Sequence, residues 1–151
     1  MENETRYCTF HLGEAEYALD VADIGEVLRD VERCAVPLAP ASVLGLTNLR
    51  GQIVTLLDLA TRLGHAGAEA RAVCVPPVSI VLTCARPPLG LCVDAIGDVV
   101  TLSAASLLPP PATLDERTRA LVRGVHLSGE RLITVLETKA LLAGFLEDAR
   151  G

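Results

Sequence analysis

The sequence predicts a mainly β fold arranged as two small barrels or sandwiches. Three observations support this prediction: short alternating apolar segments, an almost entirely aliphatic supply of core residues, and an internal repeat. Half of the 151 residues are hydrophobic but only 3% are aromatic, so Val, Leu, Ile and Ala must fill the core. Such aliphatic and β-branched runs favour sheet. A chain of this length usually forms one domain, and we expect a single domain over residues 1–151.

The first half begins with three short strands and continues into a hairpin. Strands are predicted at Arg6–Leu12, Glu16–Val21 and Ile24–Arg29, because apolar and polar residues alternate there. The apolar runs Leu44–Leu49 and Ile53–Leu57 flank a short polar turn, which is typical of a β-hairpin. The first half therefore supplies about five strands.

The hairpin turn presents Arg50 next to Gly51. A charged tip cannot be buried cheaply, so the core residues of the hairpin must lie on its strands. We expect these core residues to be Leu46, Leu49, Ile53 and Leu57. Directly after the hairpin, Asp58 is expected to cap a short helical turn that ends at Gly64.

The second half repeats this layout and adds a helix. Its predicted strands are Val78–Ala85, Leu89–Val93, Asp98–Leu102, Leu121–Leu127 and Leu132–Glu137. The last segment, Lys139–Glu147, places its apolar residues on one stripe, as in an amphipathic helix. That stripe consists of Leu141, Leu142, Phe145 and Leu146. We therefore expect the terminal helix to pack against the core.

Two sets of matches indicate an internal duplication. Leu19–Val27 matches Leu91–Val99 at an offset of 72 residues, with the glycine and the acidic position in the same order. Ile53–Asp58 matches Leu132–Glu137 at an offset of 79 residues. The alternative is chance similarity between aliphatic hairpins, but ordered glycine and acid matches are hard to obtain from composition alone.

The repeat predicts the domain organisation. The two approximate halves span residues 6–64 and 78–147, and the weakly patterned residues 65–77 are the best candidate for a linker. Many short strands joined by proline-bearing connections favour barrels or sandwiches over a parallel sheet. Terminal strands are free to cross between the two barrels.

Charge and terminal composition disfavour several function classes. The net charge of −6 repels phosphate backbones and anionic lipid surfaces, and few aromatic residues are available to stack on bases. The N-terminus is polar and acidic where a secretory signal would be basic and then apolar. No apolar run approaches the length that spans a membrane. We therefore expect a cytoplasmic protein that neither binds nucleic acid nor inserts into a membrane.

The chain shows no pattern for a metal, cofactor or catalytic site. Its five cysteines have neither metal-clip nor redox-motif spacing, so we expect reduced and mostly buried thiols. It lacks a nucleophile elbow, a phosphate-binding glycine loop, a zincin helix and a dinucleotide fingerprint. We expect no enzyme, no cofactor and no metal. A nucleic-acid-binding or other ligand-binding β-barrel module stays open as an alternative.

Several segments carry a resemblance to a known family. They are Phe10–Asp20, Val43–Gly51, Ile53–Gly64, Val93–Val99 and the run that starts at Val122-Arg-Gly-Val125. On these segments the chain resembles the CheW family of chemotaxis coupling proteins from end to end. The resemblance implies two SH3-like five-stranded β-barrels related by a pseudo-twofold, with short helical turns and a C-terminal helix. It also implies a non-enzymatic scaffold that joins chemoreceptor tips to the regulatory domain of a CheA-type histidine kinase.

The resemblance also implies partner-binding residues. The receptor-binding positions of the family fall on Ile24, Glu26, Gly45, Asn48, Leu49, Arg50 and Gly51. For Arg50 the alternative interpretation is a solvated turn residue, although its five-donor fork suits a partner surface rich in carboxylates and carbonyls. The chain departs from the family at Leu44 and Thr47, where lysine and an aliphatic residue are common. The departures alter the expected charge of this surface.

Overall fold

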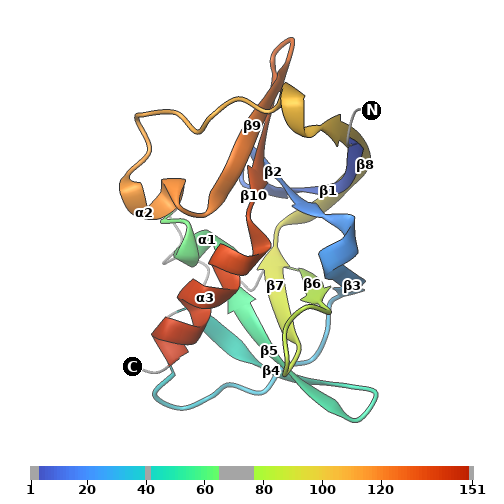
Figure 1. Ribbon diagram of the computed structural model, residues 1–151. Coiled ribbons are helices and arrows are strands. Elements are labelled where there is room, and N and C mark those ends of the chain that lie inside the picture. Colours follow the sequence, from blue (N-terminus) through green and yellow to red (C-terminus); the bar gives the residue numbers. More distant parts are fainter. Residues whose placement is uncertain (1–3, 40–41, 65–76, 150–151) are drawn as a thin grey trace.

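Ten strands form two five-stranded sheets in this computed structural model, which describes residues 4–39, 42–64 and 77–149 (Figure 1). The first sheet has the order β8 (Ala95–Ser103), β1 (Glu4–Leu12), β2 (Ala15–Asp20), β10 (Arg131–Leu136) and β9 (Val122–Ser128). The second sheet has the order β3 (Ile24–Arg29), β6 (Val78–Leu82), β7 (Leu89–Val93), β5 (Gln52–Asp58) and β4 (Val43–Leu49). The helices are α1 (Leu59–Arg62), α2 (Glu116–Arg119) and α3 (Thr138–Ala149). The predicted fold class, a mainly β protein with a terminal helix, is confirmed.

Each sheet takes strands from both predicted halves. β1 and β2 pair with β8 and β10, whereas β3 and β5 pair with β6 and β7. Two strands of each half therefore cross: β1 and β2 join the sheet of β8, β9 and β10, and β6 and β7 join the sheet of β3, β4 and β5. The boundaries of the halves stay a prediction, and residues 65–76 of the proposed linker lie outside the described part of the chain.

The same pairing pattern recurs in the two sheets. In each sheet one parallel pair, β2 with β10 or β7 with β5, lies among antiparallel pairs. Leu57 lies opposite Val43 in the second sheet, and Leu136 lies opposite Val122 in the first. The ladder register shifts next to each of these pairs. Strand pairing, and not only sequence, is thus duplicated.

The largest core cluster joins the two sheets. It contains Phe10 and Leu19 from the first sheet and Ile80 from the second, together with Leu141 and Phe145 of α3. α3 accordingly lies beside the junction of the sheets (Figure 1). Two smaller clusters fill the individual sheets, one around Ile133 and Val135 and one around Val54 and Leu56. The terminal helix therefore stabilises both halves of the molecule.

Several local predictions are wrong. Leu46 was expected in the core but is only partly buried, and the cysteines were expected to be mostly buried but Cys34 and Cys84 are exposed. Ile53 was expected in the core, but 63% of it is exposed because Val54 and Leu56 take the inward positions on β5. Asp58 precedes α1 but makes no side-chain hydrogen bond to the helix backbone. Its carboxylate instead accepts a hydrogen bond from the Thr61 hydroxyl at 2.7 Å. Gly64 ends this turn with a φ of 71°, as the pattern predicts.

Candidate partner-binding site

The tip of the β4–β5 hairpin carries a strained arginine. Leu49 pairs with Gln52, so Arg50 and Gly51 form a two-residue turn. Their φ angles are 51° and 85°, and a turn with two positive φ angles favours Asn or Gly. The Asn48 side chain braces the turn by accepting a hydrogen bond from the Gly51 backbone N–H at 2.9 Å. Backbone strain of this kind is concentrated at functional sites, which makes Arg50 a candidate for a role beyond folding.

Arg50 forms a bidentate ion pair with Glu26 of β3. Its Nη1 and Nη2 atoms donate hydrogen bonds to the two Glu26 carboxylate oxygens at 2.9 and 3.1 Å. β3 and β4 are the two outer strands of the second sheet, so the pair links the tip of the hairpin on one side of this sheet to the outer strand on the other side. The Arg50 side chain is 77% exposed, and exposed pairs add about 0–1 kcal/mol to stability. The fold therefore depends little on this pair.

An open groove lies beside the ion pair and has a volume of about 990 Å³. One wall is the β4–β5 tip, and the other is the connection between β6 and β7. Its apolar lining includes Leu49, Ile53, Val81, Leu82, Pro87 and Pro88, and its charged lining is Glu26, Arg50 and Arg86. We call this site the hairpin groove. A largely apolar surface with a few oriented charges suits the apolar face of a partner segment.

The structure brings only some of the predicted site residues together. Glu26, Leu49, Arg50 and Gly51 line the hairpin groove. Asn48 lines a separate hollow, together with Glu32, Arg33, Cys34, Leu46, Thr47 and Ile53.

The two other predicted residues, Ile24 and Gly45, do not line the groove. Ile24 is partly buried against the main core cluster. Gly45 is buried, and a Cβ at its position would lie 2.7 Å from the Cys34 carbonyl oxygen. Gly45 is therefore required for close approach of two backbone segments.

Sequence reasoning missed most of the apolar wall. Ile53, Pro87 and Pro88 line the groove, but Ile53 was expected in the core and the two prolines were not predicted as site residues. The run Ile53–Leu57 is apolar except for Thr55, so it carries no regular alternation from which the outward residues could be recognised. Two consecutive prolines after Arg86 were the available signal, because proline cannot extend a strand and marks an exposed connection.

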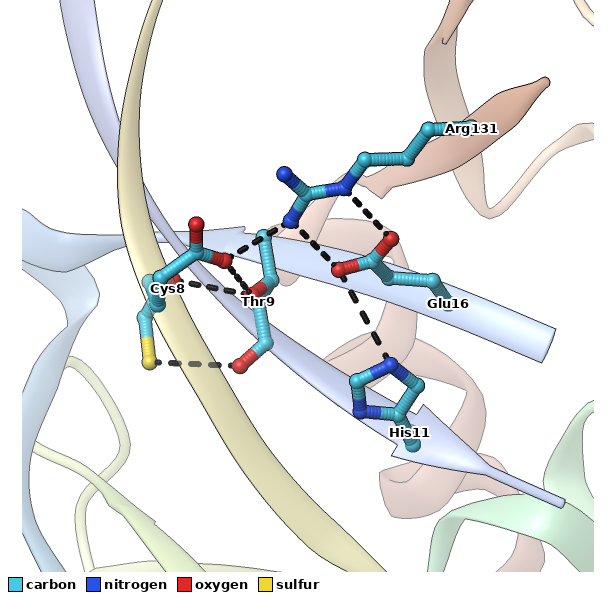
Figure 2. Close-up of polar contacts among 6 residues, drawn as sticks. Cys8, Thr9, His11, Glu16 and Arg131 are labelled. Atoms are coloured by element: carbon cyan, nitrogen blue, oxygen red, sulfur yellow. Dashed lines mark hydrogen bonds and ion pairs between the residues drawn. The ribbon is translucent and has the colours of Figure 1, made fainter. Parts of the chain in front are cut away.

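A second ion-pair network occupies the corresponding part of the first sheet. Figure 2 shows Arg131 between the carboxylate of Glu16 and the strand that carries Thr9. Arg131 donates to Glu16 at 2.9 and 2.7 Å and to Asp98 at 2.7 Å. Asp98 also accepts a hydrogen bond from Thr9 at 2.9 Å. Three strands, β10, β2 and β8, are therefore linked by one guanidinium.

Hydrogen bonding shifts the pKa values in this network. The Arg131 hydrogen bonds hold the pKa of the Glu16 carboxyl below its ordinary value. Those from Arg131 and Thr9 do the same for the pKa of Asp98. Both carboxylates are therefore stabilised in the charged form. His11 lies 3.9 Å from Glu16 at the edge of the network, as Figure 2 shows.

Neither a metal cluster nor a membrane-spanning helix is found in the part of the chain that the structure describes. Among these residues no group of three or more His, Cys, Asp or Glu side chains could hold a metal ion. Within the same ranges no helix has the length and apolar character needed to cross a membrane. The hairpin groove is the hollow that four of the seven predicted site residues line.

Two five-stranded sheets with a common core and an exposed groove define a two-sheet β domain. The CheW-like domain family matches residues 6–145, and the chain belongs to this family. It is 30% identical over 142 residues to a probable chemotaxis protein CheW of Rhizobium etli, covering 94% of this chain and 90% of the relative. It is 33% identical over 128 residues to the chemotaxis protein CheW of Rhizobium meliloti, covering 85% and 81%.

A solved structure agrees with this assignment. The scaffolding protein TtCheW from Thermoanaerobacter tengcongensis superposes with a TM-score of 0.72 at 28% identity, covering 91% of this chain and 90% of that one. The family resemblance inferred from the sequence segments is therefore confirmed, and a scaffold role in chemotaxis is the general role of the family.

Proposed function

We propose that this chain is a non-enzymatic scaffold that couples the cytoplasmic tips of chemoreceptors to the regulatory domain of a CheA-type histidine kinase. It would act in the cytoplasm, at membrane-associated receptor arrays. The observation that carries the proposal is the hairpin groove, where a strained, exposed Arg50 borders apolar side chains. Membership of the CheW-like family supports the same conclusion.

The seven predicted partner-binding residues divide into two roles under this proposal. Glu26, Leu49, Arg50 and Gly51 line the groove and would contact the receptor tip directly. The remaining three, Ile24, Gly45 and Asn48, would shape it from outside: through core packing, close backbone approach and bracing of the turn, respectively. Substituting residues of the first role should change binding, whereas substituting Gly45 should first change folding.

The decisive experiment is Arg50→Glu. The substitution removes the donor fork and places a second carboxylate beside Glu26, so we expect receptor-fragment affinity or kinase activation to fall at least tenfold. Because Arg50 is exposed, the melting temperature should stay within a few degrees of wild type. Arg29→Glu is the matched control, since Arg29 is an exposed arginine at the end of β3. Wild-type affinity in Arg50→Glu would reduce the arginine to a solvated turn residue.

A charge-swapped double variant separates partner contact from the internal ion pair. Glu26→Arg combined with Arg50→Glu keeps a pair of opposite charges across the groove. If only the closure of the sheet edges matters, the double variant should bind and activate like wild type. If Arg50 donates to the partner, binding should remain at least tenfold weaker. Receptor-fragment titration of both variants distinguishes these outcomes.

A further inference from the structure

β3 contains an extra residue directly before Glu26. Its register against β6 shifts between Ile24 and Glu26, which makes Gly25 the additional residue of a β-bulge. In a regular strand, residues that face the same side are an even number of positions apart. Because of the bulge, Ile24 and Val27 both pack against the main core although they are three positions apart, while Glu26 lines the hairpin groove. Bulges of this kind redirect side chains.

The Thr83 side chain lies over this bulge. Thr83 follows β6 and, like Gly25, lines the hairpin groove. A Cβ on Gly25 would lie 2.3 Å from the methyl carbon of Thr83, Cγ2. Thr83 is anchored in this place because its backbone N–H and its hydroxyl both donate to the Asp23 carbonyl oxygen, at 3.1 and 3.4 Å. The glycine thus makes room for the threonine methyl next to Glu26.

The first sheet has the same arrangement with its threonine turned the other way. Gly97 of β8 corresponds to Gly25 at an offset of 72 residues, and the register between β1 and β8 also shifts beside it. A Cβ on Gly97 would lie 2.3 Å from the hydroxyl oxygen of Thr9. That hydroxyl donates to the Asp98 carboxylate at 2.9 Å. In the first sheet the threonine therefore binds the acid of the bulge directly.

We propose that Thr83 and the Gly25 bulge position the Glu26–Arg50 pair for the receptor tip. In the second sheet the threonine methyl faces the bulge and the hydroxyl is bonded to Asp23, so the Glu26 carboxylate pairs with Arg50 instead of a threonine. The methyl fills the space over Gly25 and fixes the direction in which β3 presents Glu26. Glu26 then orders the exposed Arg50 side chain before a partner arrives, which lowers the entropy lost on binding. This inference rests on the receptor coupling proposed above.

Moving one methyl group between the two residues tests the packing. Gly25→Ala places a methyl where that of Thr83 already lies, and Thr83→Ser removes the threonine methyl but keeps the hydroxyl. Since each single variant disturbs the direction of Glu26, we expect receptor-fragment affinity to fall about fivefold in each. The double variant Gly25→Ala with Thr83→Ser restores one methyl at this place, so it should bind within about twofold of wild type.

A second readout needs no receptor. The NMR signal of the Glu26 side-chain carboxyl carbon, recorded on the isolated chain, reports the pairing with Arg50, and Arg50→Gln gives the signal of the unpaired carboxylate. We expect both single variants, Gly25→Ala and Thr83→Ser, to move the Glu26 signal toward this reference. The double variant should return it to the wild-type position.

Gly97→Ala is the matched control in the first sheet. Its Cβ would meet the Thr9 hydroxyl oxygen, so we expect a lower midpoint of urea denaturation. The Glu26 signal and the receptor-fragment affinity should keep their wild-type values. Thr9→Ser retains the hydroxyl oxygen and should therefore not restore the stability of Gly97→Ala.

Three outcomes would overturn the positioning role: a wild-type Glu26 signal in Gly25→Ala, additive affinity losses in the double variant, or an equal affinity loss in Gly97→Ala. Should Gly25→Ala not fold, Thr83→Ser alone carries the test, because it removes one methyl from an exposed residue. Wild-type affinity of Arg50→Glu would refute the receptor coupling and this inference with it. Lost affinity in Arg50→Glu together with unchanged affinity in Gly25→Ala would refute the positioning role alone.

Discussion

The β4–β5 and β9–β10 hairpins occupy corresponding places in the two sheets but use their charges differently. In the second sheet, Glu26 of β3 receives an arginine from the hairpin turn. In the first sheet, Asp98 lies 72 positions further along the chain than Glu26 and receives Arg131 from the strand. Arg131 also binds Glu16, so this network links three strands, whereas Arg50 has one partner beside an open groove.

The first strands of the two hairpins, β9 and β4, also differ in charge near their starts. Arg123 of β9 donates to Glu137 at 2.9 and 3.1 Å, and to the Tyr7 hydroxyl at 3.2 Å. Its counterpart at an offset of 79 is Leu44, which is buried in the small core cluster of the second sheet. The same backbone pattern therefore accommodates a charged side chain in one sheet and a buried apolar side chain in the other. The first sheet uses charges to link its strands, whereas the second leaves its hairpin tip exposed beside the hairpin groove.

The largest expected effect on stability follows from a substitution in the core cluster that joins the two sheets. Leu141 of α3 is fully buried in the cluster that joins them, and Leu→Ala changes at such sites cost about 2–5 kcal/mol. We expect Leu141→Ala to lower the free energy of unfolding by this amount, with a single transition in urea. Leu132→Ala, at a half-exposed leucine, is the control and should change it by less than about 0.5 kcal/mol. Two separate transitions would show that the sheets unfold independently.

The next largest effect is expected at Gly45 and Gly124, which correspond in the repeat at an offset of 79 residues. A Cβ on Gly45 would lie 2.7 Å from a backbone oxygen, that of Cys34, at a φ of 152°. A Cβ on Gly124 would meet the Leu107 Cβ at 2.8 Å and the Leu108 oxygen at 3.1 Å. We expect Gly45→Ala to cost about 1–3 kcal/mol and Gly124→Ala less, because only Gly45 adds a positive φ, which strains any L side chain, to the close contact. Urea denaturation of both variants measures the difference, and a larger cost at Gly124 would contradict it.

A smaller effect depends on pH and concerns the first sheet. Because the pKa values of Glu16 and Asp98 are lowered in the folded protein, their contribution to stability is present at neutral pH. It is lost as pH falls through the lowered pKa values. We expect Arg131→Gln to melt about 2 °C below wild type at pH 7. The difference should vanish once both carboxylates are protonated, and a constant difference from neutral to acidic pH would contradict the role of these charges.

The smallest effect on stability is expected for substitutions of Ile53 and Leu132, which should differ in their effect on receptor binding. Ile53 and Leu132 are 63% and 50% exposed and correspond at an offset of 79. Substitution of either by serine should change the free energy of unfolding by less than about 0.5 kcal/mol. Ile53→Ser should weaken receptor-fragment binding severalfold, since it removes an apolar wall of the hairpin groove, while Leu132→Ser should not. Equal binding losses would show that both hairpins contact the receptor.

The sequence by itself determined the strands, the hairpins, the repeat and the family. These depend on local periodicity, turn residues and segment similarity, all of which are visible without knowing which strands meet. It also led to Glu26 and Arg50 through the family resemblance. The short helix α2 (Glu116–Arg119) was missed, because four polar residues carry no apolar period.

Only the tertiary structure decided how these pieces meet. The exchange of strands between the halves, the Arg50–Glu26 pair across the sheet edges and the outward direction of Ile53 all depend on long-range pairing. An apolar run interrupted only by Thr55 does not show which of its residues face inward, because a one-residue shift in register reverses every side chain. The groove exists because the sheet brings Glu26 of β3 to Arg50 at the hairpin tip. No local sequence pattern shows that these two residues, 24 positions apart in the chain, come into contact.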